Sequence, residues 1–213
     1  MAVKRIHGAA VLAAAVPIGA AGTALMKHGS FGLTPFYSVS LALYHATGLF
    51  TMGTWNTVYQ VVLILTLMAI LRRFKMRYVL SFAVAAITSV ILDLFNSLCL
   101  ALPATLPVRI VCYAAGFLLL TLGVALMAEC KLPVSPMNLF VRELSEEWNR
   151  PFRNVKLGFD LGCLIISVTI SLCFTGHLNG VGPGTIVSAL LTGPMSGIYI
   201  AWLRRHFCIT IST

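Results

Sequence analysis

The stretch Gly22-Thr-Ala-Leu-Met26 returns with one substitution, 101 residues later, as Gly123-Val-Ala-Leu-Met127. A proline stands nine residues after each copy, at Pro35 and at Pro136. Self-similarity at one fixed offset is typical of a chain built from repeated units. We therefore expect two copies of one structural unit.

Each of these prolines is expected to begin a short helix. Thr34 and Ser135 precede them, and a Thr or Ser cap followed by proline at the first helical position is a common helix start. Gly48 and Asn149 stand thirteen residues after the prolines, and both residue types often end helices. A helix of this length spans about 20 Å, which is too short to cross a bilayer.

The composition is typical of a membrane protein. Of the 213 residues, 59% are hydrophobic and only 10% are charged, and the mean hydropathy is +0.93. A helix needs about 20 apolar residues to cross the hydrocarbon core. Six segments are apolar enough and of nearly that length, at about 8–26, 56–71, 78–102, 108–128, 157–175 and 184–203. The sequence therefore predicts an all-α membrane protein with six transmembrane helices in a single polytopic membrane domain.

The first segment also has features of a signal peptide, with Lys4 and Arg5 before it and Ala20-Ala21-Gly22 near its end. However, its closing motif returns at the end of 108–128, inside the chain. A cleaved leader has no reason to match an internal helix. We therefore interpret 8–26 as a transmembrane helix.

The basic residues predict the orientation in the membrane. With six spans and a cytoplasmic N-terminus, only Lys27 and Arg109 of the 15 Lys and Arg residues lie in external segments. Cytoplasmic loops are enriched in Lys and Arg, so we expect both termini in the cytoplasm. The formal net charge of +9 is then explained by loops beside anionic lipid, and we expect no nucleic-acid partner.

Three spans in each unit determine the symmetry. Because three is an odd number, the second unit, 103–213, enters the membrane from the side opposite to the first, 1–102. The predicted fold is therefore two three-helix inverted repeats, each with a short non-spanning helix after its first span. Inverted repeats are common in secondary transporters.

The two short helices differ in character. Residues 35–47 are largely apolar and are expected to form a re-entrant or interfacial helix on the outer side. Residues 136–148 alternate apolar and charged positions at helical spacing, with Arg142 and Glu143 on the charged face. This pattern predicts an amphipathic helix lying on the cytoplasmic surface.

Both aspartates lie within predicted spans, where acids are costly and tend to face a cavity or the bundle interior. Asp93 shares a helical face with Ser89 and Asn96, and it is expected to be the deeper of the two acids. Asp160 stands one helical turn after Lys156 and can pair with it. We expect these residues to bind a substrate or an ion, with a structural ion pair as the alternative for Asp160.

The last span begins at a glycine-rich break and carries a polar stripe. Gly184 and Thr185 open it, and Ser188 and Thr192 follow at steps of three and four residues. Exposed amides at such a helix start attract anions. We predict that these four residues belong to the binding site and that Asp93 shares a cavity with them; a kinked packing helix is the alternative.

The chain offers little for catalysis or for metal binding. Its six cysteines show no paired spacing, so we expect neither a disulfide framework nor a metal site. No His-Glu-x-x-His, Gly-x-Ser-x-Gly or Gly-x-Gly-Asp motif is present. We expect a protein that is not an enzyme and carries no cofactor.

Several short motifs resemble the YczE/YyaS/YitT group of bacterial integral membrane proteins. They are Gly180-Val-Gly182-Pro-Gly184-Thr185 with Ala189-Leu190 and Gly193-Pro194 after it, the Thr-Pro or Ser-Pro after a Gly-x-Ala-Leu span, and Leu92-Asp93-Leu94-Phe95. The chain departs from the pattern at Pro183, which stands among the glycines. The resemblance extends over most of the chain and implies a bacterial inner-membrane protein.

Two function classes follow from these features. The inverted repeat, the broken helices and the intramembrane acids favour a small-solute transporter with its site between the repeats. The alternative is a non-transporting accessory protein, or a substrate-capturing subunit of a larger transporter, whose small-residue faces bind another membrane protein. The partners expected are the lipid bilayer and a small solute, and the sequence leaves open a homo-oligomer or a partner membrane protein.

Overall fold

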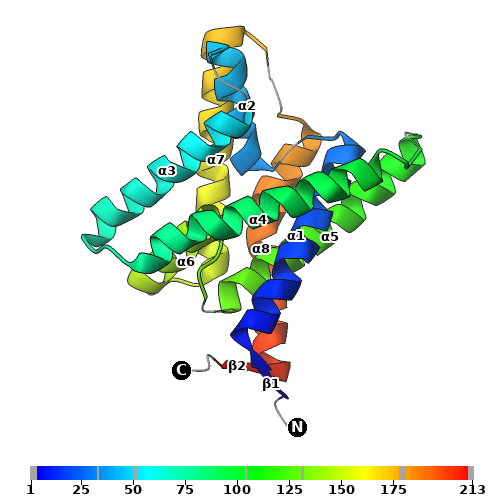
Figure 1. Cartoon of the computed structure of the whole chain (residues 1–213). Helices are drawn as coiled ribbons and strands as arrows, with labels where there is room; N and C mark the ends of the chain where they lie inside the picture. The colour runs from blue at the N-terminus through cyan, green and yellow to red at the C-terminus, as the bar shows by residue number, and fades with distance from the viewer. Residues whose placement is uncertain are drawn as a thin grey trace.

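The computed structural model describes residues 4–32, 34–49, 52–103, 105–130, 132–177 and 181–210. Six long helices cross one another in the ribbon view of Figure 1: α1 (Gly8–Gly29), α3 (Met52–Leu71), α4 (Met76–Cys99), α5 (Leu106–Glu129), α7 (Phe152–Thr175) and α8 (Pro183–His206). All six are long and apolar enough to cross a membrane. The chain is thus a multi-pass membrane protein with the six spans that its hydropathy predicts.

Two short helices, α2 (Pro35–Thr47) and α6 (Pro136–Glu147), begin at the predicted prolines. In each of them the N-terminal part is buried and the C-terminal end is exposed. Neither is long enough to span a bilayer. The local cap and proline pattern therefore predicted both helices within one residue of their observed ends.

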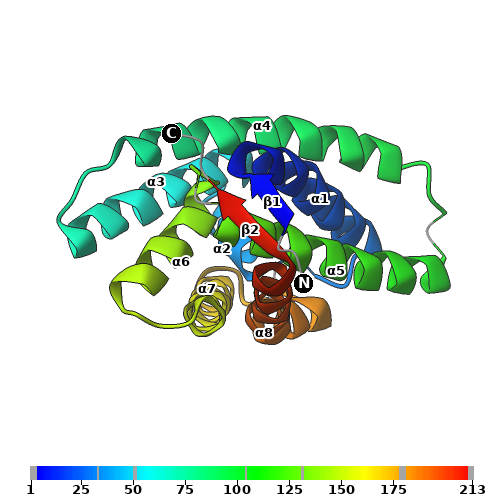
Figure 2. The same ribbon diagram turned by 90° about the horizontal axis from the view of Figure 1, so that it is seen from below.

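The two ends of the chain pair with each other, which the all-α prediction did not include. Strand β1 (Lys4–His7) runs parallel to β2 (Phe207–Thr210), and the pair lies beyond the first turns of α1 and the last turns of α8. Figure 2 shows the two strands side by side at one end of the molecule. The described termini therefore lie at the same end, as an even number of spans requires.

Helices α1 and α5 lie against each other in antiparallel fashion (Figures 1 and 2). At one end a Cβ added to Gly8 would lie 2.8 Å from the carbonyl oxygen of Cys130, and at the other a Cβ on Gly29 would lie 3.0 Å from that of Arg109. The repeated glycines lie at the centre of this contact. The stretch that occurs twice in the sequence therefore lies in a close backbone contact between α1 and α5.

Helix α6 is packed more deeply than the amphipathic pattern predicted. Arg142 and Glu143, which we expected on its outer charged face, are 4% and 2% exposed, whereas Glu146 and Glu147 are exposed. For Glu143 the reason lies at the start of α4: Arg77 Nη1, in the first turn of α4, donates to Glu143 Oε1 at 2.8 Å, and Lys75, just before α4, pairs with the other carboxylate oxygen. These cations cover a face that would otherwise turn to water.

Candidate functional site

A cavity of about 100 Å³ lies at the centre of the bundle, and each of the eight helices in the described residues contributes to its wall. A water molecule occupies roughly 30 Å³ of liquid, so this volume holds about three waters or a solute of a few heavy atoms. Polar side chains from different helices reach it, including Thr23, Asn56, Gln60 and Thr192. A polar cavity inside a membrane bundle is a candidate binding site.

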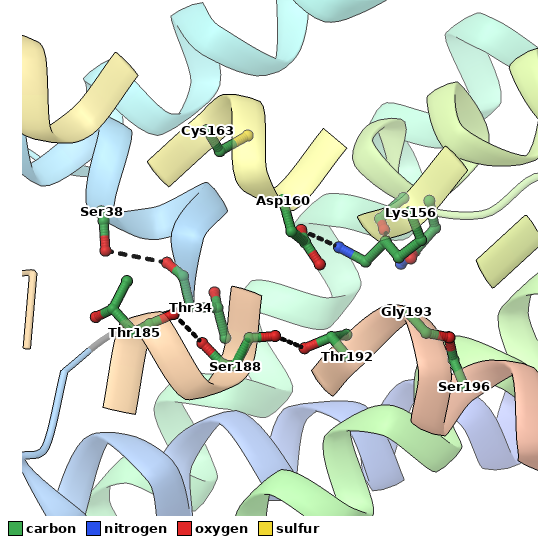
Figure 3. A network of polar contacts seen from close by, with 12 residues as sticks. Thr34, Ser38, Lys156, Asp160, Cys163, Thr185, Ser188, Thr192, Gly193 and Ser196 are labelled. Carbon is green, nitrogen blue, oxygen red and sulfur yellow. Dashed lines mark hydrogen bonds and ion pairs between the residues drawn. The ribbon is translucent and has the colours of Figure 1, made fainter. Parts of the chain in front are cut away.

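The cavity contains a buried ion pair on α7. Lys156 Nζ donates to Asp160 Oδ1 at 2.5 Å, and the two residues are 3% and 1% exposed. Figure 3 shows both side chains between α7 and α8. The other carboxylate oxygen, Oδ2, is buried without a hydrogen-bond partner among the described residues. The predicted pairing is confirmed, with one acceptor left over.

This pair is poorly suited to a purely structural role. At a spacing of four residues, an acid before a base stabilises a helix more than the reverse order found in Lys156 and Asp160. Desolvating two charges also offsets most of their attraction, so apolar residues in their place are often as stable. An acid with a free oxygen beside a cavity therefore indicates a site that binds something.

The N-terminus of α2 opens onto the same cavity. The first helical hydrogen bond runs from Ser38 N–H to the Thr34 carbonyl at 3.0 Å, and Thr34 makes no side-chain cap. The amides of Phe36 and Tyr37 precede this bond, and both residues line the cavity. The first N–H groups of a helix have no partner within it, so they are available to a ligand.

The N-terminus of α6 reaches the cavity in the same way. Its first helical bond runs from Leu139 N–H to the Ser135 carbonyl at 2.9 Å, and the amides of Met137 and Asn138 precede it. Ser135, Met137 and Asn138 all line the cavity. One helix start from each half of the chain thus faces a single space.

Asn138 adds a second free acceptor. Its Nδ2 donates to Ser135 Oγ at 2.9 Å and contacts Met127 Sδ at 3.2 Å, which uses the amide hydrogens. Its Oδ1 is buried without a partner among the described residues, and the side chain is 5% exposed. Sequence reasoning missed this residue, because its role depends on Met127, which only the folded chain brings beside it.

The predicted site residues separate into three groups, which lie at the central cavity, at the start of α8 and in a separate groove. Ser89, Asp160 and Thr192 line the cavity, and Lys156 joins them. Thr185 and Ser188 are buried but do not line it. In Figure 3 these hydroxyls bond along α8: Ser188 Oγ donates to the Thr185 carbonyl at 3.0 Å, and Thr192 Oγ1 donates to that of Ser188 at 2.5 Å.

Gly184 lies at a junction between elements. Its N–H donates to the Phe31 carbonyl at 2.9 Å, and its own carbonyl accepts from Tyr113 Oη at 2.5 Å. Thr185 completes the junction, since its Oγ1 accepts the Gly182 N–H at 3.2 Å. These contacts attach the start of α8 to α5 and to the loop after α1.

Asp93 does not share the cavity with Thr185, Ser188 or Thr192, so this expectation was wrong. Asp93 and Asn96 line an open groove of about 610 Å³ between α1, α4 and α5, together with Lys27 and Arg109. Asp93 is exposed, whereas Asp160 is the deeply buried acid. Ser89, one turn earlier on the same face of α4, lines the cavity, as does Leu92, whereas Asp93 lines the groove.

Comparisons with known proteins agree with the resemblance seen in the motifs. The model of one family, described as "Family of unknown function (DUF6198)", matches residues 6–201. The chain is also similar to the uncharacterized protein YyaS of Bacillus subtilis (strain 168), with 27% identity over 194 residues that cover 87% of this chain and 89% of that protein. No solved structure matches the chain. The predicted kinship with a YyaS-like family is confirmed.

Proposed function

The chain belongs to the DUF6198 family, and we propose that it is a small-solute transporter of the bacterial inner membrane whose binding site is the central cavity. The observation that carries this proposal is the Lys156–Asp160 pair, which is buried in the cavity with Asp160 Oδ2 unpartnered. Burying an acid without its hydrogen bonds at membrane depth costs on the order of several kcal/mol. A solute that supplies the missing hydrogen bond recovers that cost.

An inverted repeat would support the transport mechanism. The contacts between α1 and α5 come in pairs related by the offset of 101 residues. Gly22 contacts Leu120 and Gly116. Gly123, which is 101 residues after Gly22, contacts Gly19 and Ala15, which are 101 residues before Leu120 and Gly116. Corresponding helices that run antiparallel fit two units inserted in opposite orientations. Rocking of one unit against the other would then open the cavity to each side in turn.

The charge distribution supports an orientation with both termini in the cytoplasm. The loop between α3 and α4 and the buried acid Glu143 form a basic and acidic cluster around α6. Basic loops of this kind stay in the cytoplasm. In this orientation α6 closes the cavity toward the cytoplasm and α2 closes it toward the outside.

A substrate-capturing subunit of a larger transporter is the second candidate function. Four alanines of α1 are exposed on one side of the bundle, at positions 9, 10, 13 and 14. Small residues on a lipid-facing helix allow another helix to approach closely. In this case the cavity would bind the same solute, and a partner protein would drive its release.

Solute uptake tests the proposal without knowledge of the substrate. Metabolites are compared between cells that express the wild type, the double variant Lys156→Met with Asp160→Leu, or Asp93→Asn, each checked for equal insertion in the membrane. We expect the wild type to accumulate a solute that cells with the double variant do not accumulate, while Asp93→Asn retains uptake. Loss of uptake in Asp93→Asn alone would place the site in the outer groove instead.

A further inference from the structure

The charges and hydrogen-bonding groups of the central cavity also indicate what kind of solute it binds, an inference that rests on the proposed function. Among the described lining residues, Lys156 and Asp160 are the only basic and acidic ones, and the opposite charges of this ion pair cancel. A ligand with a net charge would leave that charge uncompensated in a low-dielectric site. A ligand without net charge is therefore favoured.

The cavity's free hydrogen-bond acceptors and its free donors come from different parts of the structure. Two buried oxygens, Asp160 Oδ2 and Asn138 Oδ1, accept no hydrogen bond from the part of the chain that the structure describes. Their only remaining capacity is to accept hydrogen bonds, since Asn138 already uses Nδ2 on Ser135 and Met127. A ligand that satisfies a carboxylate and an amide oxygen together must present several N–H or O–H groups, as an ammonium group does.

The donors of the cavity come from the two short helices. Phe36, Tyr37, Met137 and Asn138 line the cavity, and their amides precede the first helical hydrogen bonds of α2 and α6. Each helix start carries a partial positive charge, and such starts bind carboxylates and phosphates. Because one start comes from each half of the chain, a carboxylate held between them would join the two halves.

We propose that the solute is a small zwitterion of the amino-acid type. Its carboxylate binds the amides at the starts of α2 and α6, and its ammonium binds Asp160 Oδ2 and Asn138 Oδ1. The zwitterion carries one positive and one negative charge and no net charge. It therefore matches a cavity in which the charges of Lys156 and Asp160 cancel. The cavity of about 100 Å³ favours a small side chain, such as that of glycine or alanine.

Binding to the purified protein in detergent tests this proposal apart from transport. Radiolabelled alanine is expected to bind saturably, and unlabelled glycine is expected to compete. Propionate lacks the ammonium and ethylamine lacks the carboxylate, so each should compete at least about a hundredfold more weakly, because a buried partner is left unpaired. Phenylalanine should not compete, because its side chain exceeds the cavity.

Two variants locate the binding. Asn138→Leu keeps the branched shape of the side chain but adds bulk and removes both the acceptor Oδ1 and the donor Nδ2, so alanine should bind about tenfold or more weakly. Lys156→Met combined with Asp160→Leu replaces the ion pair by apolar groups of similar size, a change that buried pairs often tolerate, and should abolish binding. Glu147→Gln, on the exposed end of α6, serves as the control with unchanged binding.

The outcomes separate the solute class from the function. Equal competition by propionate or by ethylamine, or unchanged alanine binding in the double variant, would overturn the zwitterion proposal. The proposal also fails if neither alanine nor glycine binds while cells show Asp160-dependent uptake of another solute, and transport then stands. If alanine binds at this site but proteoliposomes do not take it up, the site stands and the transport function fails.

Discussion

Gly22 on α1 and Gly116 on α5 meet backbone to backbone: a Cβ added to either residue would lie 2.7 Å from the carbonyl oxygen of the other. A methyl group at this distance would clash with backbone atoms, which cannot move aside as the end of a flexible side chain can. This contact holds the two halves of the chain together at the level of the central cavity.

Gly22→Ala is therefore expected to lower the free energy of unfolding by about 1–3 kcal/mol, the usual cost of overpacking. Thermal unfolding of the purified protein in detergent measures the effect. Gly158→Ala on α7 is the matched control, because a Cβ at Gly158 meets nothing within 4 Å. The control should be neutral or gain up to about 1 kcal/mol from helix propensity. Equal stability of Gly22→Ala and Gly158→Ala would contradict the close contact.

The ion pair in the cavity predicts strongly coupled substitutions. Asp160→Asn leaves Lys156 buried without a counter-charge and should destabilise the fold by about 3–5 kcal/mol. Lys156→Met combined with Asp160→Leu should cost far less, since apolar groups then fill the space. Denaturation of the single and double variants measures the coupling. A double variant as unstable as Asp160→Asn would show that the two residues act independently.

The ion pairs of Glu143 with Lys75 and Arg77 are expected to hold α6 against the rest of the bundle. Cys130 lies at the end of α5 with 0% exposure, and burial raises the pKa of its thiol, so little reactive thiolate forms at neutral pH. In a protein whose other cysteines are replaced, Cys130 should resist maleimide. Glu143→Gln removes the charge that Lys75 and Arg77 hold, and it should speed labelling severalfold.

The exposed Glu147 supplies the control for this experiment, because Glu147→Gln changes the same group on the same helix without touching the cluster. Its labelling rate should equal that of the wild type. If Glu143→Gln leaves Cys130 equally protected, α6 is held in place by its apolar contacts and not by the ion pairs of Glu143.

Reporter fusions test the orientation on which the inverted repeat depends. Fusions after residues 75 and 150 should report a cytoplasmic location, and a fusion after residue 30 an external one. Residue 150 is the informative site, because it follows α6 in the second half. An external signal there would give both halves the same orientation and would remove the inverted repeat.

Local chemistry predicted some elements closely and could not predict others. The starts of α2 and α6 follow from Thr-Pro and Ser-Pro, because a cap and a proline act within one helical turn. The Lys156–Asp160 pair follows from spacing on one helix. The pairing of β1 with β2 joins residues about 200 positions apart, so no local pattern indicates it.

The relative depth of Asp93 and Asp160 was predicted wrongly, since Asp93 was expected to be the deeper of the two. Helical periodicity shows that Ser89 and Asp93 share a face, but it does not show how far along that face the neighbouring helices extend. In the structure the cavity includes Ser89 and ends before Asp93. The free oxygen of Asn138 was unpredictable for a related reason, since its partner Met127 belongs to another helix.

The proposal of alternating access is tested most directly at Thr192, which lines the cavity and is 4% exposed. In a protein without other cysteines, Thr192→Cys is treated with a small membrane-impermeant thiol reagent in right-side-out and in inside-out vesicles. Ser196→Cys, one turn further along α8, is buried but does not line the cavity and should stay unlabelled. A transporter predicts labelling of Thr192→Cys from both sides, whereas labelling from one side only, or from neither, would contradict the alternating opening of the cavity.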